Sequence, residues 1–420
     1  MNKNLKAYIF LWLTQSLSTL GSAMTGYALV LWLYQSSGSA LQTALLTVCT
    51  YSPYVIMSIF AGSLADRFNK KKVLLICDLL AAVGTAAVLI LIKTDSLLPW
   101  HLYLINAFGG LMNTVQQPAG EIAATLLVPP EYYQKTSGMR SFSQSLTTIL
   151  NPVLATALFA FAGIEWVITV DLVTFGVAFI SLMFFIKIPE KPAEKTETAP
   201  LLSSAKEGLC WLGKNPLILK LIMFLAAINL VASVYDAAMP AMVLSKENET
   251  ALGAVNAFVG AASLLGSVLV TALPAPKSRV RAICLSLLIS MSTENFLLAF
   301  GRTPALWCIG AVLGWLPIPY MNANMDVIFR STIPAEMQGR VYSCRNTLQF
   351  FTIPLGFFLG GLLVDNVFEP FMAIQAEGSI LHEIFGMGKG SGAALLFAVI
   401  GVTGVIVCLI FGWLLRKEKA

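Results

Sequence analysis

The sequence predicts an all-α membrane protein with twelve transmembrane helices in two pseudo-symmetric six-helix bundles. Three observations predict this class: an apolar composition, a succession of long apolar runs separated by short charged loops, and an internal repeat. Hydrophobic residues make up 57% of the 420 residues and charged residues only 12%. Because charged residues approach about 25% in soluble domains, a soluble globular fold is excluded.

Twelve apolar runs are each long enough to cross a bilayer, which takes a helix of about 20 residues. The first run is too long for the core of a signal peptide and lacks a convincing cleavage site, so we expect it to remain as a membrane helix. The predicted helices span residues 7–34, 43–64, 73–92, 97–128, 138–163, 165–187, 216–244, 251–273, 281–301, 303–333, 341–364 and 390–415.

One polar interval, residues 188–215, separates the sixth apolar run from the seventh. Its first half combines prolines with alternating lysine and glutamate, a composition typical of a flexible linker. Its second half, 201–212, carries leucine and tryptophan beside lysine and suits a short helix along the membrane interface. We therefore predict an amino-terminal half over 1–187, a cytoplasmic linker over 188–215 and a carboxy-terminal half over 216–420.

Lysine and arginine are divided unequally between the two sides of the predicted bundle. Of the 27 such residues, twenty-two fall on one side and four on the other, which predicts that both termini are cytoplasmic. This topology explains the net charge of +5, so we expect no nucleic-acid partner. The seven cysteines have no CxxC spacing and the two histidines lie far apart, so we expect no disulfide and no metal site.

The internal repeat has a shift of 205 residues. It places VPPEYYQKTSGMRSFSQ, residues 128–144, over IPAEMQGRVYSCRNTLQ, residues 333–349, without a gap. A chance match is the alternative, but an acid, a Pro-x-Glu, two basic residues and a glutamine fall in register. The matched pairs are Pro129 with Pro334, Glu131 with Glu336, Lys135 with Arg340, Arg140 with Arg345, Gln144 with Gln349 and, on the preceding helices, Glu121 with Asp326. Two six-helix halves follow from this repeat.

A short charged stretch, GSLADRFNKKK at residues 62–72, joins the second and third predicted helices. It resembles the signature of the major facilitator superfamily, with Asn69, which suits a left-handed turn, in place of the second glycine. Lysines after an apolar helix would by themselves indicate only which side of the membrane is cytoplasmic. The position of this stretch in the chain, the order of its residues and the internal repeat favour the superfamily signature. The residues that match it are Gly62, Asp66, Arg67, Lys70 and Lys71.

The resemblance implies a conformational latch on the cytoplasmic side. In the family, the loop aspartate faces the start of the eleventh helix and a loop base pairs with an acid of the fourth. Applied to this chain, the family pattern implies that Asp66 is stabilised by the start of the eleventh helix and by Arg345. It also implies that Lys70 or Arg67 pairs with Glu121. The predicted members are Gly62, Asp66, Arg67, Lys70, Lys71, Glu121, Arg140, Asp326 and Arg345.

The second half is expected to hold a counterpart of this latch. There Asp326 would pair with Arg279 or Arg281, in a loop that has kept only basic character. The alternative for both halves is a set of independent loop charges that merely neutralise one another.

Three acids lie deeper in the predicted spans, where a charge costs roughly 2.5–3.5 kcal/mol at a helix centre. Helices 1, 4, 7 and 10 line the central cavity in the resembled family, which makes Asp236 the candidate for proton coupling and for holding a cationic or amphipathic substrate. Its alternative is an interfacial aspartate in solvent. Glu294 belongs to a helix that usually faces lipid, and Asp171 is interpreted as a packing or interface residue.

Uncharged polar residues gather on the same cavity helices. Asn113, Gln116 and Gln117 have the spacing that places side chains on one helix face. Each amide taken singly could instead make a structural bond between helices. Together with neighbouring aromatic and methionine residues they predict a large amphipathic cavity. The predicted coupling and substrate residues are Asp236, Tyr235, Asn229, Gln15, Asn113, Gln116, Gln117 and Asn322.

Within the superfamily, the paired starts of helices 5 and 11 and the Asp-Arg-x-Asn-Lys-Lys loop resemble the bacterial macrolide-efflux-like branch. This implies a monomer in the cell membrane that exports amphipathic small molecules or drugs, driven by protons or another coupling ion, with no cofactor. The glycine-rich motif of other antiporters is missing from LNPVLATAL at 150–158, so this helix does not predict the direction of transport. Alternatives are a lysophospholipid or siderophore transporter of the same fold, and a non-transporting membrane sensor. The chain has no phosphate-binding loop and no Ser-His-Asp set, so we expect no enzyme.

Overall fold

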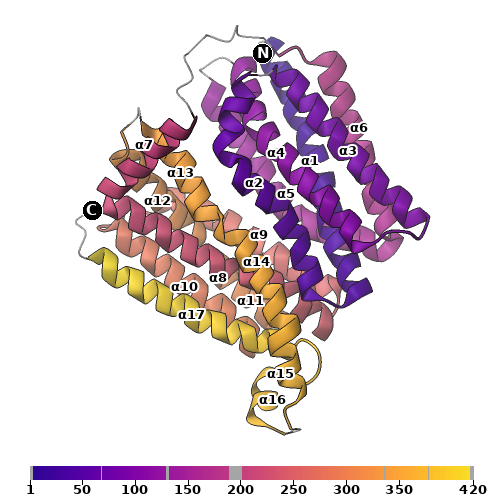
Figure 1. Ribbon diagram of the computed structural model, residues 1–420, viewed down its shortest axis with the longest axis vertical. Coiled ribbons are helices and arrows are strands. Elements are labelled where there is room, and N and C mark those ends of the chain that lie inside the picture. Colours follow the sequence, from indigo (N-terminus) through magenta and orange to yellow (C-terminus); the bar gives the residue numbers. More distant parts are fainter. Residues whose placement is uncertain are drawn as a thin grey trace. The chain divides into compact units, whose positions relative to one another are not determined.

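The computed structural model describes residues 3–67, 69–128, 132–188, 201–334, 337–376 and 378–416 (Figure 1). Within these residues the chain is almost entirely helical and no strand forms. The helices divide into two compact units. One holds Met1–Leu33 and Cys49–Leu201, and the other holds Tyr34–Val48 and Leu202–Ala420. Each unit is described by itself.

The first six membrane helices follow the predicted order. The first three extend one to four residues past both predicted ends, whereas the fourth is shorter than predicted, and the fifth and sixth begin before their predicted starts and stop one or two residues before their predicted ends. The sixth ends in a π-helical turn, η2. The bounds are α1 Lys3–Ser37, α2 Ala40–Arg67, α3 Lys70–Lys93, α4 Pro99–Leu127, α5 Tyr133–Ala162, α6 Ile164–Ile180 and η2 Ser181–Phe185.

The remaining chain contains the predicted linker helix, α7, and six further spans, two of which are built from several pieces. The bounds are α7 Leu201–Lys214, α8 Pro216–Lys246, α9 Glu249–Ala272, α10 Arg279–Phe300, α11 Pro304–Trp315, α12 Ile318–Thr332, α13 Gln338–Phe350, α14 Thr352–Leu363, η4 Val364–Phe368, α15 Glu369–Ala373, α16 Ile380–Phe385 and α17 Ser391–Arg416.

Proline explains why two predicted helices are interrupted. The tenth was predicted as one helix over 303–333, but it breaks at the turn that contains Pro317, between α11 and α12. The eleventh breaks at Phe351, three residues before Pro354. Proline lacks an N–H and its ring clashes with the preceding turn, which weakens the helix at these two points. α2, α5 and α8 nevertheless continue through Pro53, Pro152 and Pro240. Counting each broken pair once gives twelve membrane spans in the described residues, eleven of them long and strongly apolar and one, α4, rich in amides.

The stretch from 62 to 72 is mostly helical, which corrects the expectation of a charged loop. α2 continues through Arg67 and α3 begins at Lys70. Asn69 has extended backbone angles, φ −60° and ψ 119°, instead of the predicted left-handed turn, and its side chain accepts a hydrogen bond from the N–H of Lys72 at 2.9 Å. It is therefore the N-cap of α3, a position that asparagine favours.

In the first unit, a buried apolar cluster joins four helices near the ends that the charge distribution predicts to be cytoplasmic. Leu11 of α1, Leu74 of α3, and Ala119 and Ala123 of α4 belong to it, together with Ile186 after α6. Burying side chains of this kind contributes about 1.5–3 kcal/mol each where they leave water. This apolar cluster fixes the register of α1, α3 and α4 against one another.

In the second unit, α8 is the central helix and most of its side chains are buried. It packs against α14, α17, α13 and α9. Gly360 lets α14 approach closely, because a Cβ there would lie 2.8 Å from the Cβ of Ala237. α17 runs beside α10 along the edge of this unit, while α15 and α16 form the tip beyond α14 (Figure 1).

The linker helix α7 packs on the start of α13. Arg340 forms an ion pair with Glu207, and a Cβ at Gly208 would meet the carbonyl oxygen of Arg340 at 2.8 Å. Both charged side chains are about half exposed, so the pair contributes little by itself. The close backbone approach at Gly208 is the stronger constraint, and it holds α7 to the second unit.

Candidate functional site

Asp236 lies about two thirds of the way along α8, on the accessible face of an otherwise buried helix. Asn229, Asp236 and Pro240 are half-buried or exposed and follow one another at helical spacing. Pro240 has no N–H, so the carbonyl of Asp236 lacks the helical donor that would lie four residues on. Asp236 therefore offers a carboxylate, and a backbone carbonyl without a helical partner, on this face.

Tyr235 points into the second unit, which corrects the prediction that it lines the cavity beside Asp236. Its ring packs on Phe397 with the centroids 5.2 Å apart, and only 6% of the side chain is exposed. Its hydroxyl lies near Glu294 without the geometry of a hydrogen bond. Neighbouring residues on a helix are about 100° apart. Because Tyr235 and Asp236 are neighbours in sequence, their side chains face different directions, and only Asp236 lies on the accessible face.

Glu294 is buried, which corrects the expectation that it lies on a lipid-facing surface. Its Oε1 accepts a hydrogen bond from the Nε1–H of Trp315 at 2.8 Å. α10 packs against α11, α12 and α17, so this part of it faces protein on several sides. Glu294 and Trp315 therefore form an internal polar contact between the ninth and tenth spans.

The predicted amide residues fall into two groups. Asn113 and Gln117 of α4 are exposed, and so is Asn322 of α12. The repeat shift of 205 relates Gln117 to Asn322, so the two halves present amides at equivalent positions. Gln15 and Gln116 are half-buried and turn instead toward another helix, α3.

Those two glutamines meet Asp78, an acid that the sequence reasoning missed. Gln15 Nε2 donates to Asp78 Oδ2 at 3.4 Å and Gln116 Nε2 donates to Oδ1 at 2.5 Å. The sequence did contain a signal for Asp78. It is an acid inside the apolar run 73–92, and a charged group within a membrane span is energetically costly, so it needs a partner or a function. Asp171, by contrast, is buried and accepts a bond from Ser22 Oγ at 2.9 Å, as a packing residue would.

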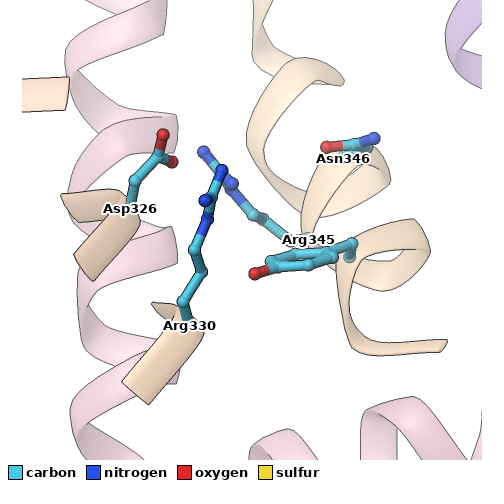
Figure 2. Close-up of a pocket in the computed structure, with 5 residues that line it drawn as sticks. Asp326, Arg330, Arg345 and Asn346 are labelled. Atoms are coloured by element: carbon cyan, nitrogen blue, oxygen red, sulfur yellow. The ribbon is translucent and has the colours of Figure 1, made fainter. Parts of the chain in front are cut away.

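A cavity of about 550 Å³ lies at α12 and α13. Its lining residues are Asp326, Arg330, Tyr342, Arg345 and Asn346. Figure 2 shows the charged ends of Asp326, Arg330 and Arg345 directed toward one another. Arg345 is further held by Gln349, whose Oε1 accepts from Nε at 3.0 Å, and by the ring of Phe329 at 4.5 Å. Two guanidinium groups face one carboxylate, so the cavity suits an additional anion.

The second-half counterpart of the latch is not arranged as predicted. Arg279 donates to Asn324 Oδ1 at 3.0 Å, whereas Asp326 faces the cavity with Arg345. The repeat mates Arg140 and Arg345 also differ, since Arg140 is exposed and Arg345 is half-buried. The two halves have therefore diverged at this end.

Several predicted latch residues lie outside the described side chains, namely Gly62, Asp66, Arg67 and Glu121. Lys70 is half-buried at the start of α3. Lys71 donates through Nζ to the carbonyls of Met183 at 2.9 Å and Ile186 at 2.8 Å. It thus ties α3 to the end of the sixth span by satisfying carbonyls that a helix end leaves free, a role that the motif alone did not indicate.

Two acids one turn apart near the end of the eleventh span cap two other helices of the second unit. Asp365 accepts from Ser39 Oγ at 2.5 Å and from the N–H groups of Ala40 and Leu41 at 3.0 and 2.9 Å. A Cβ at Gly361 would lie 2.5 Å from Cα of Leu41, so α14 packs directly on the start of α2. The negative charge of Asp365 thus satisfies the free donors of α2.

Glu369 makes the same kind of cap for α17, accepting from the N–H groups of Gly390 at 3.0 Å and Ala393 at 3.1 Å. The two acids therefore form a matched pair of helix caps on one segment. They explain why Tyr34–Val48 packs with the second unit, since Asp365 holds the start of α2.

Replacing Asp365 with alanine should free the start of α2. Loss of a cap costs about 1 kcal/mol, so we expect the amides of Ala40 and Leu41 to exchange with deuterium about fivefold faster. Peptide-resolved exchange measured by mass spectrometry checks this. Glu369→Ala is the matched control and should accelerate exchange at 390–393 only. Unchanged exchange at Ala40 and Leu41 in Asp365→Ala would show that the cap does not hold α2.

Twelve membrane spans in the described residues, with polar side chains at accessible positions within them, are an architecture suited to a membrane transporter. A family model described as the Major Facilitator Superfamily matches residues 11–277. The chain belongs to the Major Facilitator Superfamily.

Two relatives and one solved structure illustrate this membership. The chain is 24% identical over 372 residues to "Macrolide efflux protein A" of Streptococcus pyogenes, covering 87% of this chain and 91% of that protein. It is 24% identical over 356 residues to "Multidrug efflux pump Tap" of Mycolicibacterium fortuitum, covering 82% and 86%. A bacterial homolog of the human lysosomal transporter Spinster, inward-facing and occupied, has a TM-score of 0.72 at 14% identity and covers 100% of this chain and 98% of that one.

Proposed function

We propose that this transporter exports amphipathic small molecules, macrolide-like compounds among them, in exchange for protons. The observation that carries the proposal is the accessible carboxylate of Asp236 within α8, a helix whose other side chains are mostly buried. An acid at such a depth has a high energetic cost unless it serves an ion or substrate. The names of the relatives, which are efflux proteins for macrolides and for several drugs, support the direction and the substrate class.

The other accessible polar groups fit the same substrates. Asn113, Gln117 and Asn322 are uncharged and can both donate and accept hydrogen bonds. A surface that combines such amides with one acid suits neutral or cationic amphiphiles and disfavours anions. We therefore assign substrate contact to these amides and to Asn229, and proton coupling to Asp236.

The latch remains part of the proposal. Asp66 follows the family signature, and the cavity with Arg330 and Arg345 has an excess of positive charge. We propose, as the family resemblance implies, that Asp66 is stabilised by Arg345 in one conformational state. Its release in the other state would then let the transporter alternate.

Export is tested in a bacterial host that lacks its own drug exporters. Cells that make the protein should accumulate less of a radiolabelled macrolide than cells with the empty vector, and a protonophore should remove the difference. A labelled lysophospholipid in the same assay tests the alternative substrate. Unchanged macrolide levels together with movement of the lysophospholipid would overturn the proposed substrate class.

Both termini are proposed to be cytoplasmic, and a native thiol can test this. Cys210 on α7 is the exposed member of the seven cysteines, and Ala376 is exposed in the segment between α15 and α16. In intact cells a membrane-impermeant maleimide should spare Cys210 and label Ala376→Cys placed in a Cys210→Ser background. Inverted vesicles should give the opposite pattern. Labelling of Cys210 in intact cells would reverse the orientation.

A further inference from the structure

The contact of Asp78 with two glutamines joins three helices of the first unit. Asp78 lies about 12 Å along α3 from its start, at 1.5 Å per residue. Gln15 approaches Oδ2 from α1 and Gln116 approaches Oδ1 from α4. Each carboxylate oxygen thus accepts one amide N–H and keeps one further acceptor position. We call these three residues the Asp78 triad.

The triad lies directly beside the buried apolar cluster. Gln15 follows Leu11 by one helical turn, and Asp78 follows Leu74 in the same way. The apolar cluster therefore separates the carboxylate from the cytoplasmic ends predicted for α1 and α3. A charge at this place is poorly solvated and needs either a counter-charge or a proton.

No cationic side chain supplies that counter-charge among the described residues. α3 packs against α4, α6 and the π-helical turn η2, and Asp78 receives uncharged amides from α1 and α4. No charged group of α6 or η2 acts on it in the described part of the chain. The neighbouring titratable group is the thiol of Cys77, while Glu121 of α4 lies outside the described side chains. Lys71 on the same helix is engaged with the carbonyls of Met183 and Ile186.

Glutamine is suited to both protonation states of such an acid. Its N–H groups donate to an ionised carboxylate, and after rotation of the amide its Oε1 accepts from a protonated one. Arginine or lysine in the same position would stabilise the ionised state only. Proton uptake at Asp78 therefore replaces an N–H donation to the carboxylate by an O–H donation from it, on the contacts that connect α3 to α1 and α4.

We propose that the Asp78 triad is a second proton-binding site, located in the amino-terminal half. The proton adds to one oxygen of the Asp78 carboxylate, and the glutamine facing that oxygen reverses its amide to accept the new O–H. Release of the proton restores the two N–H donations. This proposal rests on proton-driven transport only for its physiological use, since the binding step is a property of the protein alone.

Infrared difference spectroscopy of the purified full-length protein between acid and alkaline pH tests proton binding without substrate. In an Asp236→Asn background, which removes the other acid proposed to titrate, we expect a carboxylic acid carbonyl band that titrates and is lost when Asp78→Asn is added. Gln116→Lys should also remove it, because the ammonium group keeps Asp78 ionised while the acid itself is retained. Asp171→Asn, at the other acid that is hydrogen-bonded inside the first unit, is the matched control and should retain the Asp78 band. A titrating carbonyl amplitude that neither Asp78→Asn nor Gln116→Lys reduces would overturn the proposal.

Transport assays separate this proposal from the proposed function. In proteoliposomes, Asp78→Asn should retain downhill macrolide exchange but weaken its dependence on pH. If an imposed pH gradient drives macrolide uptake equally in wild type and in Asp78→Asn, and the carbonyl amplitude is also unchanged in Asp78→Asn, the second site is wrong and proton-driven export stands. If the band is lost as expected but no macrolide moves in the wild type, the proton site stands and the proposed substrate class fails.

Discussion

Replacing Asp236 with asparagine should abolish accumulation of substrate against its gradient while allowing downhill exchange. Asparagine keeps the size and a hydrogen-bonding oxygen of the side chain but cannot take up or release a proton. Binding of an amphipathic substrate by the amides Asn113, Gln117 and Asn322 should therefore persist, since these residues are not changed. The coupling of substrate movement to the proton gradient should not persist.

The measurement uses proteoliposomes with an imposed pH gradient and a labelled macrolide. Wild type should concentrate the label at least about tenfold, equivalent to a driving force of about 1.4 kcal/mol, and Asp236→Asn should only equilibrate it. Glu294→Gln is the matched control, because Glu294 is the other deep acid of the second unit but is bonded internally to Trp315. Uphill transport by Asp236→Asn would place the coupling site elsewhere, and Asp326 or Glu294 would be tested next.

Asp66→Asn should reduce transport by about tenfold with little change in expression or in substrate binding. Removing the charge that is proposed to be stabilised by Arg345 alters the populations of two conformations, and a shift of about 1.4 kcal/mol changes their ratio tenfold. Contact with the substrate is not altered. Arg345→Gln should have a similar effect, because it removes the partner.

The two changes combined distinguish a direct latch from independent charges. If Asp66 and Arg345 act on each other, the double variant should be no worse than either single variant, whereas independent sites would add. Lys72→Gln is the matched control, because Lys72 is exposed at the same junction and is not part of the signature. Full transport by Asp66→Asn, or additive losses in the double variant, would rule the latch out.

The positions of the helices could be read from the sequence with little ambiguity. Each span needs about 20 apolar residues, and the short loops between them carry the charges. The breaks at Pro317 and Phe351 were less predictable. Pro317 and Pro354 stand inside those runs and remove a helical donor, but α2, α5 and α8 continue through their own prolines. The end of α2 was less predictable, since the charged sequence after Gly62 was compatible with either a loop or one more helical turn.

The spacing of three and four residues between the amides of α4 did not predict the contact that each amide makes. Asn113 and Gln117 are accessible as predicted, whereas Gln116 turns to Asp78. Adjacent positions on one broad helix face can meet different neighbours. The sequence therefore located the polar segment but could not assign a partner to each residue in it.

What the sequence alone determined was the membrane class, the twelve spans, the repeat of 205 residues and the signature at 62–72. Only the tertiary structure decided that Asp236 is accessible while Tyr235 and Glu294 are buried, that Asp78 meets two glutamines, and that Asp365 caps α2. The physical reason is that lipid and protein interior are both apolar. A membrane helix is therefore apolar on all sides, and its pattern does not reveal which face meets protein.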